Sequence, residues 1–315
     1  MSGISNICDL FDVDEISGLL DFPLFFEIET VHKCNAKCRM CTIETWPERN
    51  DFMDANLFRK IASELGDHAQ IVRACTLCRD GEPLLDRGLE EKISMLKANG
   101  IKHVVISTNA SILDKKRSLS LLDSGLDEIM FSVDGYTKET FEAIRTGLHY
   151  ETVLRNILGF LEERALRGSR LKVRVRMILQ SSNISEFGIW YRFWKNKVCA
   201  TDKVYAKPIH SWGNQLDMAD NAFTEIRNMM DACSALWTTM IIHSDGAIPA
   251  CSVDYKNIFL SGNVSDQTIK SVWNSEMLTK LRRIHLAGRR DDIDLCRNCY
   301  LWDRSTIVNG TERDV

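Results

Sequence analysis

Apolar residues along the first two thirds of the chain alternate between short runs and longer amphipathic segments. The short runs are mostly apolar, which is typical of buried parallel strands. Between them, apolar residues recur every three or four positions, the spacing of one helix face. We therefore expect strands at residues 24–28, 71–77, 103–107, 128–133, 172–179 and 203–207. The intervening helices are expected at residues 54–65, 90–98, 117–124, 138–144, 152–164 and 187–196.

Strands that alternate with helices at this interval predict right-handed crossovers and a parallel sheet. Six such units are too few to complete an eight-unit barrel, so we expect an open sheet. In parallel α/β folds, ligands bind at the carboxyl ends of the strands. Gly81-Glu82-Pro83 and Ser132-Val133-Asp134-Gly135 follow two of the expected strands, and a cysteine-rich loop follows the first one.

The pattern changes at about residue 211. Beyond it we expect short strands at residues 238–243 and 247–250, a turn at 244–246 and a helix at 268–286. The expected organisation is therefore an N-terminal cap over residues 1–22, an α/β region over 23–210 and a smaller C-terminal region over 211–315.

Composition narrows the class of protein. The chain has 315 residues, a formal charge of −4 and no dense Lys/Arg run, which argues against a nucleic-acid surface. No uncharged apolar stretch approaches the length of a membrane span, and residues 1–22 lack the pattern of a signal peptide. The 11 cysteines are too few and too unevenly placed for a disulfide-stapled secreted fold. We expect a reduced, cytoplasmic protein with no membrane partner.

The first cysteine set, Cys34, Cys38 and Cys41, has the spacing C-x3-C-x2-C. Thiolates are ligands for iron–sulfur clusters and zinc, and a cluster of four irons normally takes four of them. Three thiolates would leave one iron open to a small molecule that chelates through nitrogen and oxygen. A zinc site with a distant fourth ligand and three unrelated buried thiols are the alternatives.

The second set provides four thiolates, enough to saturate a cluster, with a structural zinc site as the alternative. Its members are Cys233, Cys251, Cys296 and Cys299.

Together these motifs resemble those of the radical S-adenosylmethionine (radical SAM) superfamily. The first cysteine set resembles its cluster-binding loop, and the two turns after strands resemble its cofactor-binding motifs. The segments at residues 245–251, 262–264 and 271–273 resemble the SPASM/twitch extension. A full SPASM pattern has seven cysteines, whereas no cysteine follows Cys299. This chain is therefore similar to the twitch type with a single auxiliary cluster.

The resemblance implies a (β/α)6 partial TIM barrel with a small C-terminal auxiliary iron–sulfur domain. It implies two [4Fe-4S] clusters, one that binds S-adenosylmethionine (SAM) through the first cysteine set and one auxiliary. It also implies a flavodoxin- or ferredoxin-type reductant and a small-molecule substrate. The residues expected to bind the cofactor are Gly81, Glu82, Pro83, Asn109, Ser132, Asp134 and Ile178.

Cys75 and Cys78 form a C-x2-C pair that looks like a metal site. Residues three apart in a strand point to opposite faces, however, so we expect one thiol in the barrel lumen and the other under the helices. A lumen thiol can return a hydrogen atom to a carbon radical, so these two cysteines are the candidate catalytic residues. The alternative is that each thiol is buried and has no chemical role.

Three enzyme functions and one structural role remain open. The resemblance favours oxidation of a secondary alcohol of a carbohydrate- or aminocyclitol-type substrate, as in carbohydrate or antibiotic biosynthesis, with the auxiliary cluster as electron acceptor. Epimerisation of a sugar carbon and modification of a ribosomal peptide are the alternatives, and a non-catalytic metal scaffold is the structural one. Candidate substrate contacts are Arg73, Arg79, Asp80, Asn109, Arg174, Arg176, His210 and Trp212.

Overall fold

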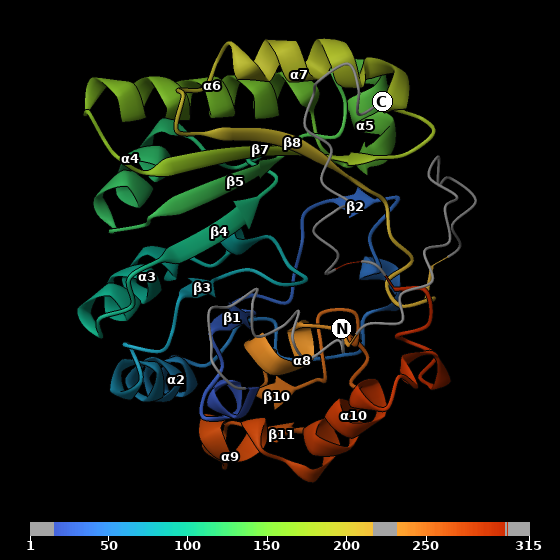
Figure 1. Cartoon of the computed structure of the whole chain (residues 1–315). Coiled ribbons are helices and arrows are strands. Elements are labelled where there is room, and N and C mark those ends of the chain that lie inside the picture. The colour runs from blue at the N-terminus through green and yellow to red at the C-terminus, as the bar shows by residue number, and fades with distance from the viewer. Residues whose placement is uncertain (1–15, 217–231, 300, 302–315) are drawn as a thin grey trace.

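A seven-stranded parallel sheet forms the body of the molecule in the computed structural model, which describes residues 16–216, 232–299 and 301 (Figure 1). The strand order is β8-β7-β5-β4-β3-β1-β9, and each neighbouring pair is parallel. The strands are β1 Phe25–Ile28, β3 Ala74–Thr76, β4 Val104–Thr108, β5 Glu128–Ser132, β7 Lys172–Leu179, β8 Lys203–Pro208 and β9 Thr239–Ile242. The sheet does not close, because β8 and β9 are its two edges. The expected partial barrel is confirmed.

Helices cover the outer side of this sheet (Figure 1). They are α2 Ala55–Asp67, α3 Leu89–Ala98, α4 Lys115–Asp123, α5 Lys138–Ile144, α6 Tyr150–Leu166 and α7 Phe187–Lys195. Side chains fix three of their starts: Asp54, Asp114 and Thr137 each accept a hydrogen bond from a backbone N–H of the first turn. Short 3-10 turns lie at η1 Ile16–Leu20, η2 Ile43–Thr45, η3 Pro83–Leu85 and η4 Ile184–Glu186.

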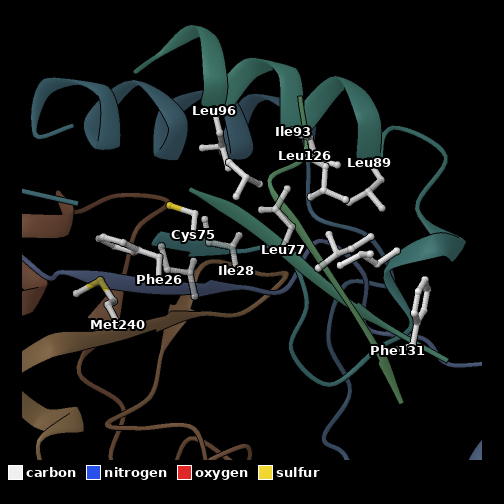
Figure 2. Packing of buried hydrophobic residues seen from close by; sticks show 14 of the residues in the cluster. Phe26, Ile28, Cys75, Leu77, Leu89, Ile93, Leu96, Leu126, Phe131 and Met240 are labelled. Carbon is white, nitrogen blue, oxygen red and sulfur yellow. The ribbon is translucent and has the colours of Figure 1, made fainter. Parts of the chain in front are cut away.

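The hydrophobic core lies between the sheet and the helices. Figure 2 shows Leu89, Ile93 and Leu96 of α3 directed at the outer face of the sheet, where the Cys75 side chain lies among them. Cys75 is fully buried, and its neighbours are apolar. Side chains on this face therefore pack the core. Residues that bind ligands are expected on the opposite face of the sheet and at the strand ends.

The edge strand β9 departs from the expected organisation. We expected a short strand at residues 238–243 in the C-terminal region, but β9 pairs with β1 in the register Phe25↔Thr239 to Ile28↔Ile242. The sheet therefore gains a seventh strand from beyond residue 211. The physical reason is that an apolar strand buried on both faces needs hydrogen-bond partners, and the free edge of β1 supplies them.

The remaining C-terminal elements pack beyond the β1 edge (Figure 1). They are α8 Ala235–Thr238, β10 Ala247–Ile248, β11 Gly262–Asn263, α9 Ile269–Trp273, α10 Glu276–Leu286 and η5 Arg290–Asp292. The single helix expected at 268–286 is two helices, because the Ser275 hydroxyl accepts from Leu278 N and starts a new one. Trp273 Nε1 donates to Leu19 O at 3.1 Å, which ties this region to η1. Most of the expected N-terminal cap lies outside the described residues.

A second small pairing brings the cysteine loop to the barrel. β2 Lys37–Cys38 and β6 Arg145–Thr146 form an antiparallel pair in which Cys38 stands opposite Arg145.

In the part of the chain that the structure describes, no helix has the length and apolar character needed to cross a lipid bilayer.

Candidate active site

A cavity of about 420 Å³ opens at the carboxyl ends of the parallel strands. Cys34, Cys38 and Cys41 line one part of it, and Ser252 and Leu301 line another. Ser252 directly follows Cys251, and Leu301 lies two positions after Cys299. The cavity therefore touches the first cysteine set and borders the second.

The loop that carries the first cysteine set depends on a close backbone approach. A Cβ atom at Gly81 would lie 2.2 Å from Val31 O and 2.6 Å from Lys33 O, so any larger residue would displace one of the two segments. Glu82 N donates to Lys33 O at 2.8 Å, which joins the same segments. The turn after β3 and the start of the cysteine loop are thus one packed unit.

The three thiols of this loop lie near one another at a buried place. Burial raises the pKa of Cys34 to about 11 and that of Cys41 to about 12, and neighbouring cysteines add to both shifts. A single tetrahedral zinc would hold its sulfurs about 3.8 Å apart, given a Zn–S bond of about 2.3 Å. Among the described residues, no three cysteines have sulfurs within 4.8 Å of one another. This wider spacing fits an iron–sulfur cluster better than one zinc ion.

The second cysteine set also forms one group. Burial raises the pKa of Cys251 and raises that of Cys296 to about 12, and other members of the set raise each further. Cys233 and Cys299 are the remaining members. All four residues are partly buried, and Cys251, Cys296 and Cys299 pack against the core. Four mutually close thiols without the tight spacing of a zinc site fit a saturated cluster.

Glu82 lines the cavity and is buried, and its carboxylate holds the turn together. Its Oε1 accepts from Thr108 Oγ1 at 2.6 Å and from Leu84 N at 3.1 Å, and its Oε2 accepts from Asn109 N at 2.8 Å. Burial raises the pKa of Glu82, although these hydrogen bonds act in the opposite direction. The expected contact of this carboxylate with a cofactor stays a prediction, and the structure adds that three protein donors bind the same carboxylate. Pro83 is buried behind it as the first residue of η3.

Asp134 is fully buried and acts from behind the cavity wall. Its Oδ2 accepts from Arg145 Nε at 2.6 Å, and its Oδ1 accepts from Ile178 N at 2.6 Å. Arg145 and Ile178 line the cavity, whereas Asp134 does not. Burial disfavours the guanidinium charge, yet the charge of Asp134 holds the pKa of Arg145 above its ordinary value.

The sequence interpretation missed Arg145. Its only local signal is an arginine at the end of a helix, and it reaches the cavity because β6 pairs with the cysteine loop.

The other expected cofactor residues reach the cavity. Gly81, Asn109, Ser132 and Ile178 all line it. Asn109 Nδ2 donates to Asn35 Oδ1 at 3.0 Å, which links β4 to the cysteine loop. Ser132 Oγ accepts from an Arg176 guanidinium N–H at 3.3 Å.

The C-x2-C pair divides as the strand alternation predicted. Cys78 lines the cavity, whereas Cys75 lies in the core beneath α3 (Figure 2). Burial raises the pKa of Cys78 to about 12, so the group is a protonated thiol at neutral pH. A buried Cys75 cannot reach a substrate in the cavity, so of the two candidate catalytic thiols only Cys78 remains.

A buried network of charged residues lies in the segments that follow β1, β3 and β9. Glu29, Asp80 and His243 place ligand atoms within 4.8 Å of one another, a spacing that could hold a cation. The Arg49 guanidinium occupies this position instead: its Nη1 lies 3.1 Å from His243 Nδ1, 3.6 Å from Asp80 Oδ2 and 3.9 Å from Glu29 Oε2. Glu29, Asp80 and His243 therefore surround the Arg49 guanidinium, which takes the place of a metal cation.

Arg79 continues this network to the cavity surface. Its Nη1 lies 2.9 Å from Asp80 Oδ1, and its Nε lies 3.6 Å from Glu27 Oε2. Ser252 Oγ donates to the same oxygen of Glu27 at 3.0 Å. We did not predict a role for Glu27 from the sequence. The available signal was a charged residue within an otherwise apolar strand, which indicates a carboxylate that faces the lumen.

Two regions of the chain match known family models. Residues 28–164 match the radical SAM superfamily, and residues 233–300 match SPASM, described as an iron-sulfur cluster-binding domain. A probable GTP 3',8-cyclase of Methanococcus maripaludis strain C7 is 29% identical over 162 residues, which cover 51% of each protein. The chain thus spans about half the length of the first curated relatives that it matches.

Solved structures share the fold over more of the chain. BtrN in complex with AdoMet and 2-DOIA superposes with a TM-score of 0.60 at 20% identity, over 93% of this chain and 97% of BtrN. Streptococcus suis SuiB bound to its precursor peptide SuiA superposes with a TM-score of 0.67 at 17% identity, over 83% of this chain and 67% of SuiB. At such identities the likeness concerns the fold. Motifs, site geometry and the two family matches agree, and the chain belongs to the radical SAM superfamily with a C-terminal SPASM domain.

Proposed function

We propose that this radical SAM enzyme oxidises a secondary alcohol of a small, polar, carbohydrate-like substrate by two electrons. The observation that carries the proposal is one cavity lined by the first cysteine set and by Ser252, which directly follows Cys251 of the second set. A substrate in this cavity lies near the SAM-binding centre and near an electron acceptor at the same time. That arrangement suits net oxidation, in which a hydrogen atom and then an electron leave the substrate.

Cys34, Cys38 and Cys41 would hold the SAM-binding [4Fe-4S] cluster, and Cys233, Cys251, Cys296 and Cys299 would hold the auxiliary cluster. When bound and reduced by a flavodoxin- or ferredoxin-type donor, the first cluster and SAM supply a 5′-deoxyadenosyl radical that takes a substrate hydrogen atom. The protein supplies position and exclusion of water. Gly81, Asn109, Ser132 and Ile178 would contact SAM, because they line the cavity beside the cysteine loop.

Glu82 and Asp134 would act as positioning residues. Glu82 fixes the backbone at Asn109, and Asp134 fixes both Arg145 and the amide of Ile178. Arg145 then presents a guanidinium next to Cys38, where an anionic group of the cofactor would be favoured.

Oxidation also requires a base for the hydroxyl proton, and we assign this role to Glu27. Three carboxylates line the cavity: Glu27, Asp80 and Glu82. Glu82 is occupied by three protein donors, and Asp80 is enclosed by Arg49 and Arg79. Within the described ranges, the contacts of Glu27 involve its Oε2, which leaves Oε1 to accept the proton. Glu27 would take the hydroxyl proton, the 5′-deoxyadenosyl radical would take the hydrogen atom and become 5′-deoxyadenosine, and an auxiliary cluster held by the second cysteine set would accept the remaining electron.

Cys78 supports a second candidate, epimerisation of a sugar carbon. Its protonated thiol faces the cavity and could give a hydrogen atom back to a substrate radical. The resulting thiyl radical would then take an electron from the external reductant. In this reaction SAM is consumed but no ketone forms.

The test is anaerobic turnover in D₂O with the reconstituted enzyme and a panel of sugars, aminocyclitols and their acidic derivatives. We expect one ketone for each 5′-deoxyadenosine formed and no solvent deuterium at the reacting carbon. An inverted carbon carrying one deuterium would establish the epimerase instead, because a Cys78 thiol exchanges with solvent. If the enzyme does not cleave SAM under any condition, both candidates fail.

The C78A variant separates the two reactions further. C78A should still form the ketone if the enzyme is a dehydrogenase and should lose product if it is an epimerase. The matched control is C75A, which removes a sulfur from the core and not from the cavity.

A further inference from the structure

The cavity wall opposite the cysteine loop is basic. Five basic and three acidic residues line the cavity, and carboxylates in or behind its wall pair with three of the basic ones. The basic ones are Arg79, Arg145, Arg174, Arg176 and Lys207. Arg79 pairs with Asp80 and Glu27, Arg145 pairs with Asp134, and Arg174 pairs with Glu128. These charges are balanced within the protein.

Arg176 is different. Within the described part of the chain its one hydrogen bond goes to the neutral Ser132 hydroxyl, and it makes no ion pair. Its Nε is buried without a partner. A buried donor without a partner destabilises a protein, and more strongly when it belongs to a charged group. A guanidinium in this condition at a cavity wall is ready to bind an anion.

Two neighbours face the same space. In the parallel register of β7 and β8, Arg176 is opposite Tyr205 and Ile178 is opposite Lys207, so the Lys207 side chain lies on the same face, one step further along. His210 follows the end of β8 and lines the cavity. Burial lowers the pKa of His210 to about 3, and the charges of Arg176, Arg79 and Lys207 lower it further. These cations therefore converge on His210.

His210 itself is a neutral hydrogen-bond donor to this space. Trp212 N donates to His210 Nδ1 at 3.2 Å, so the ring proton of the neutral imidazole is on Nε2. The Trp212 ring packs against His210 with centroids 4.8 Å apart, and the Arg79 guanidinium lies 5.6 Å from the same ring. The ring orientation is fixed by these contacts.

We propose that Arg176, Lys207 and His210 form a subsite for an anionic group of the substrate, either a carboxylate or a phosphate. This inference rests on the proposed function and narrows its substrate class. An acidic sugar or a phosphorylated alcohol satisfies Arg176, whereas a cationic aminocyclitol would be placed against the Arg176 guanidinium. Glu27, the assigned base, lines the same cavity and would meet a hydroxyl elsewhere on that substrate.

The experiment measures anion binding without turnover. Isothermal titration calorimetry is performed anaerobically on the holoenzyme saturated with SAM, with inorganic phosphate in one arm and succinate in the other, both against constant chloride. We expect one saturable site for at least one probe, and the preferred probe identifies phosphate or carboxylate as the substrate group. R176Q should weaken binding at least tenfold, and R176K should weaken it less because it keeps the charge.

The control is R167Q. Arg167 is a half-exposed residue beyond the end of α6 that pairs with Asp123, far from the cavity lining, so R167Q should bind the probes like the wild type. Iron content and thermal unfolding show that each variant is folded. K207Q is a second test and should weaken binding in the same direction.

Three results would overturn the subsite. The first is that neither probe shows saturable binding. The second is that R176Q binds the probes as well as the wild type does, and the third is that the probes bind only when SAM is absent. The last result would assign Arg176 to the carboxylate of the cofactor. Because the titration requires no SAM cleavage, failure of the subsite is distinguishable from failure of the proposed oxidation.

Discussion

Arg145 and Asp134 form a buried ion pair 2.6 Å long, in which one partner lines the cavity and the other stands behind it. Asp134 uses its second oxygen to accept from Ile178 N, so one carboxylate fixes both a guanidinium and a strand of the cavity wall. The motif that contains Asp134 thus supports two residues that line the cavity, Arg145 and Ile178.

The variant D134N tests this support. It keeps the shape but loses the charge facing Arg145, so we expect the KM for SAM to rise about tenfold, equivalent to about 1.4 kcal/mol. Steady-state 5′-deoxyadenosine formation at varied SAM concentration measures the effect.

Asp202 offers a matched control for D134N. It pairs with Arg164 at 2.7 Å and accepts from Val173 N at 2.9 Å, which reproduces the geometry of Asp134 away from the cavity. D202N should lower the melting temperature and leave the KM for SAM unchanged. Equal KM values in D134N and D202N would contradict a supporting role for Asp134.

The first cysteine set is tested by C38A. We expect the reconstituted wild type to contain about eight irons and C38A about four, with SAM cleavage abolished in the variant. C199A is the control, because Cys199 is exposed and belongs to neither set, so its iron content and activity should match the wild type. SAM cleavage by C38A at the wild-type rate would refute the assignment of this loop.

The second cysteine set should be separable from the first. In C251A we expect about four irons, retained SAM cleavage and a loss of ketone of tenfold or more, because the substrate radical lacks its electron acceptor. Mössbauer spectroscopy and product analysis on the same sample measure both effects. Ketone formation at the wild-type ratio would show that the second set has only a structural role.

His210 predicts a pH dependence of stability. Its folded pKa of about 3 lies below the unfolded value of 6.5, so between these pH values the unfolded chain binds more protons and stability falls as pH falls. From this group alone we expect a loss of about 2 kcal/mol on going from pH 7 to pH 5.

The variant H210Q isolates this contribution. Anaerobic urea unfolding at pH 7, 6 and 5 should show a shallower pH dependence in H210Q than in the wild type. The other histidines titrate equally in both proteins and cancel in the comparison. Parallel stability curves would mean that His210 is not held neutral in the folded protein.

Much of the fold was predictable because its signals are local. The strand at residues 172–179 was predicted with its observed bounds, and α5 was likewise predicted at 138–144. The separation of Cys75 from Cys78 followed from the two-residue alternation of a strand. The second strand was predicted too long, at 71–77, chiefly because Ile71 and Val72 are apolar, yet their backbone N–H groups donate to His68 O in the turn after α2.

By itself, the sequence determined which chemistry is present: two thiol sets, the turns that follow strands, and the parallel α/β architecture. These depend on spacing within a few residues, which local geometry controls. Only the tertiary structure decided that β9 joins β1 and that Arg145 reaches Cys38. It also decided that the carboxylates of Glu82 and Asp134 accept hydrogen bonds from the protein, and that Arg176 has no carboxylate partner among the described residues. Such relationships join residues far apart in the chain, and strand register and packing set them, which no local pattern encodes.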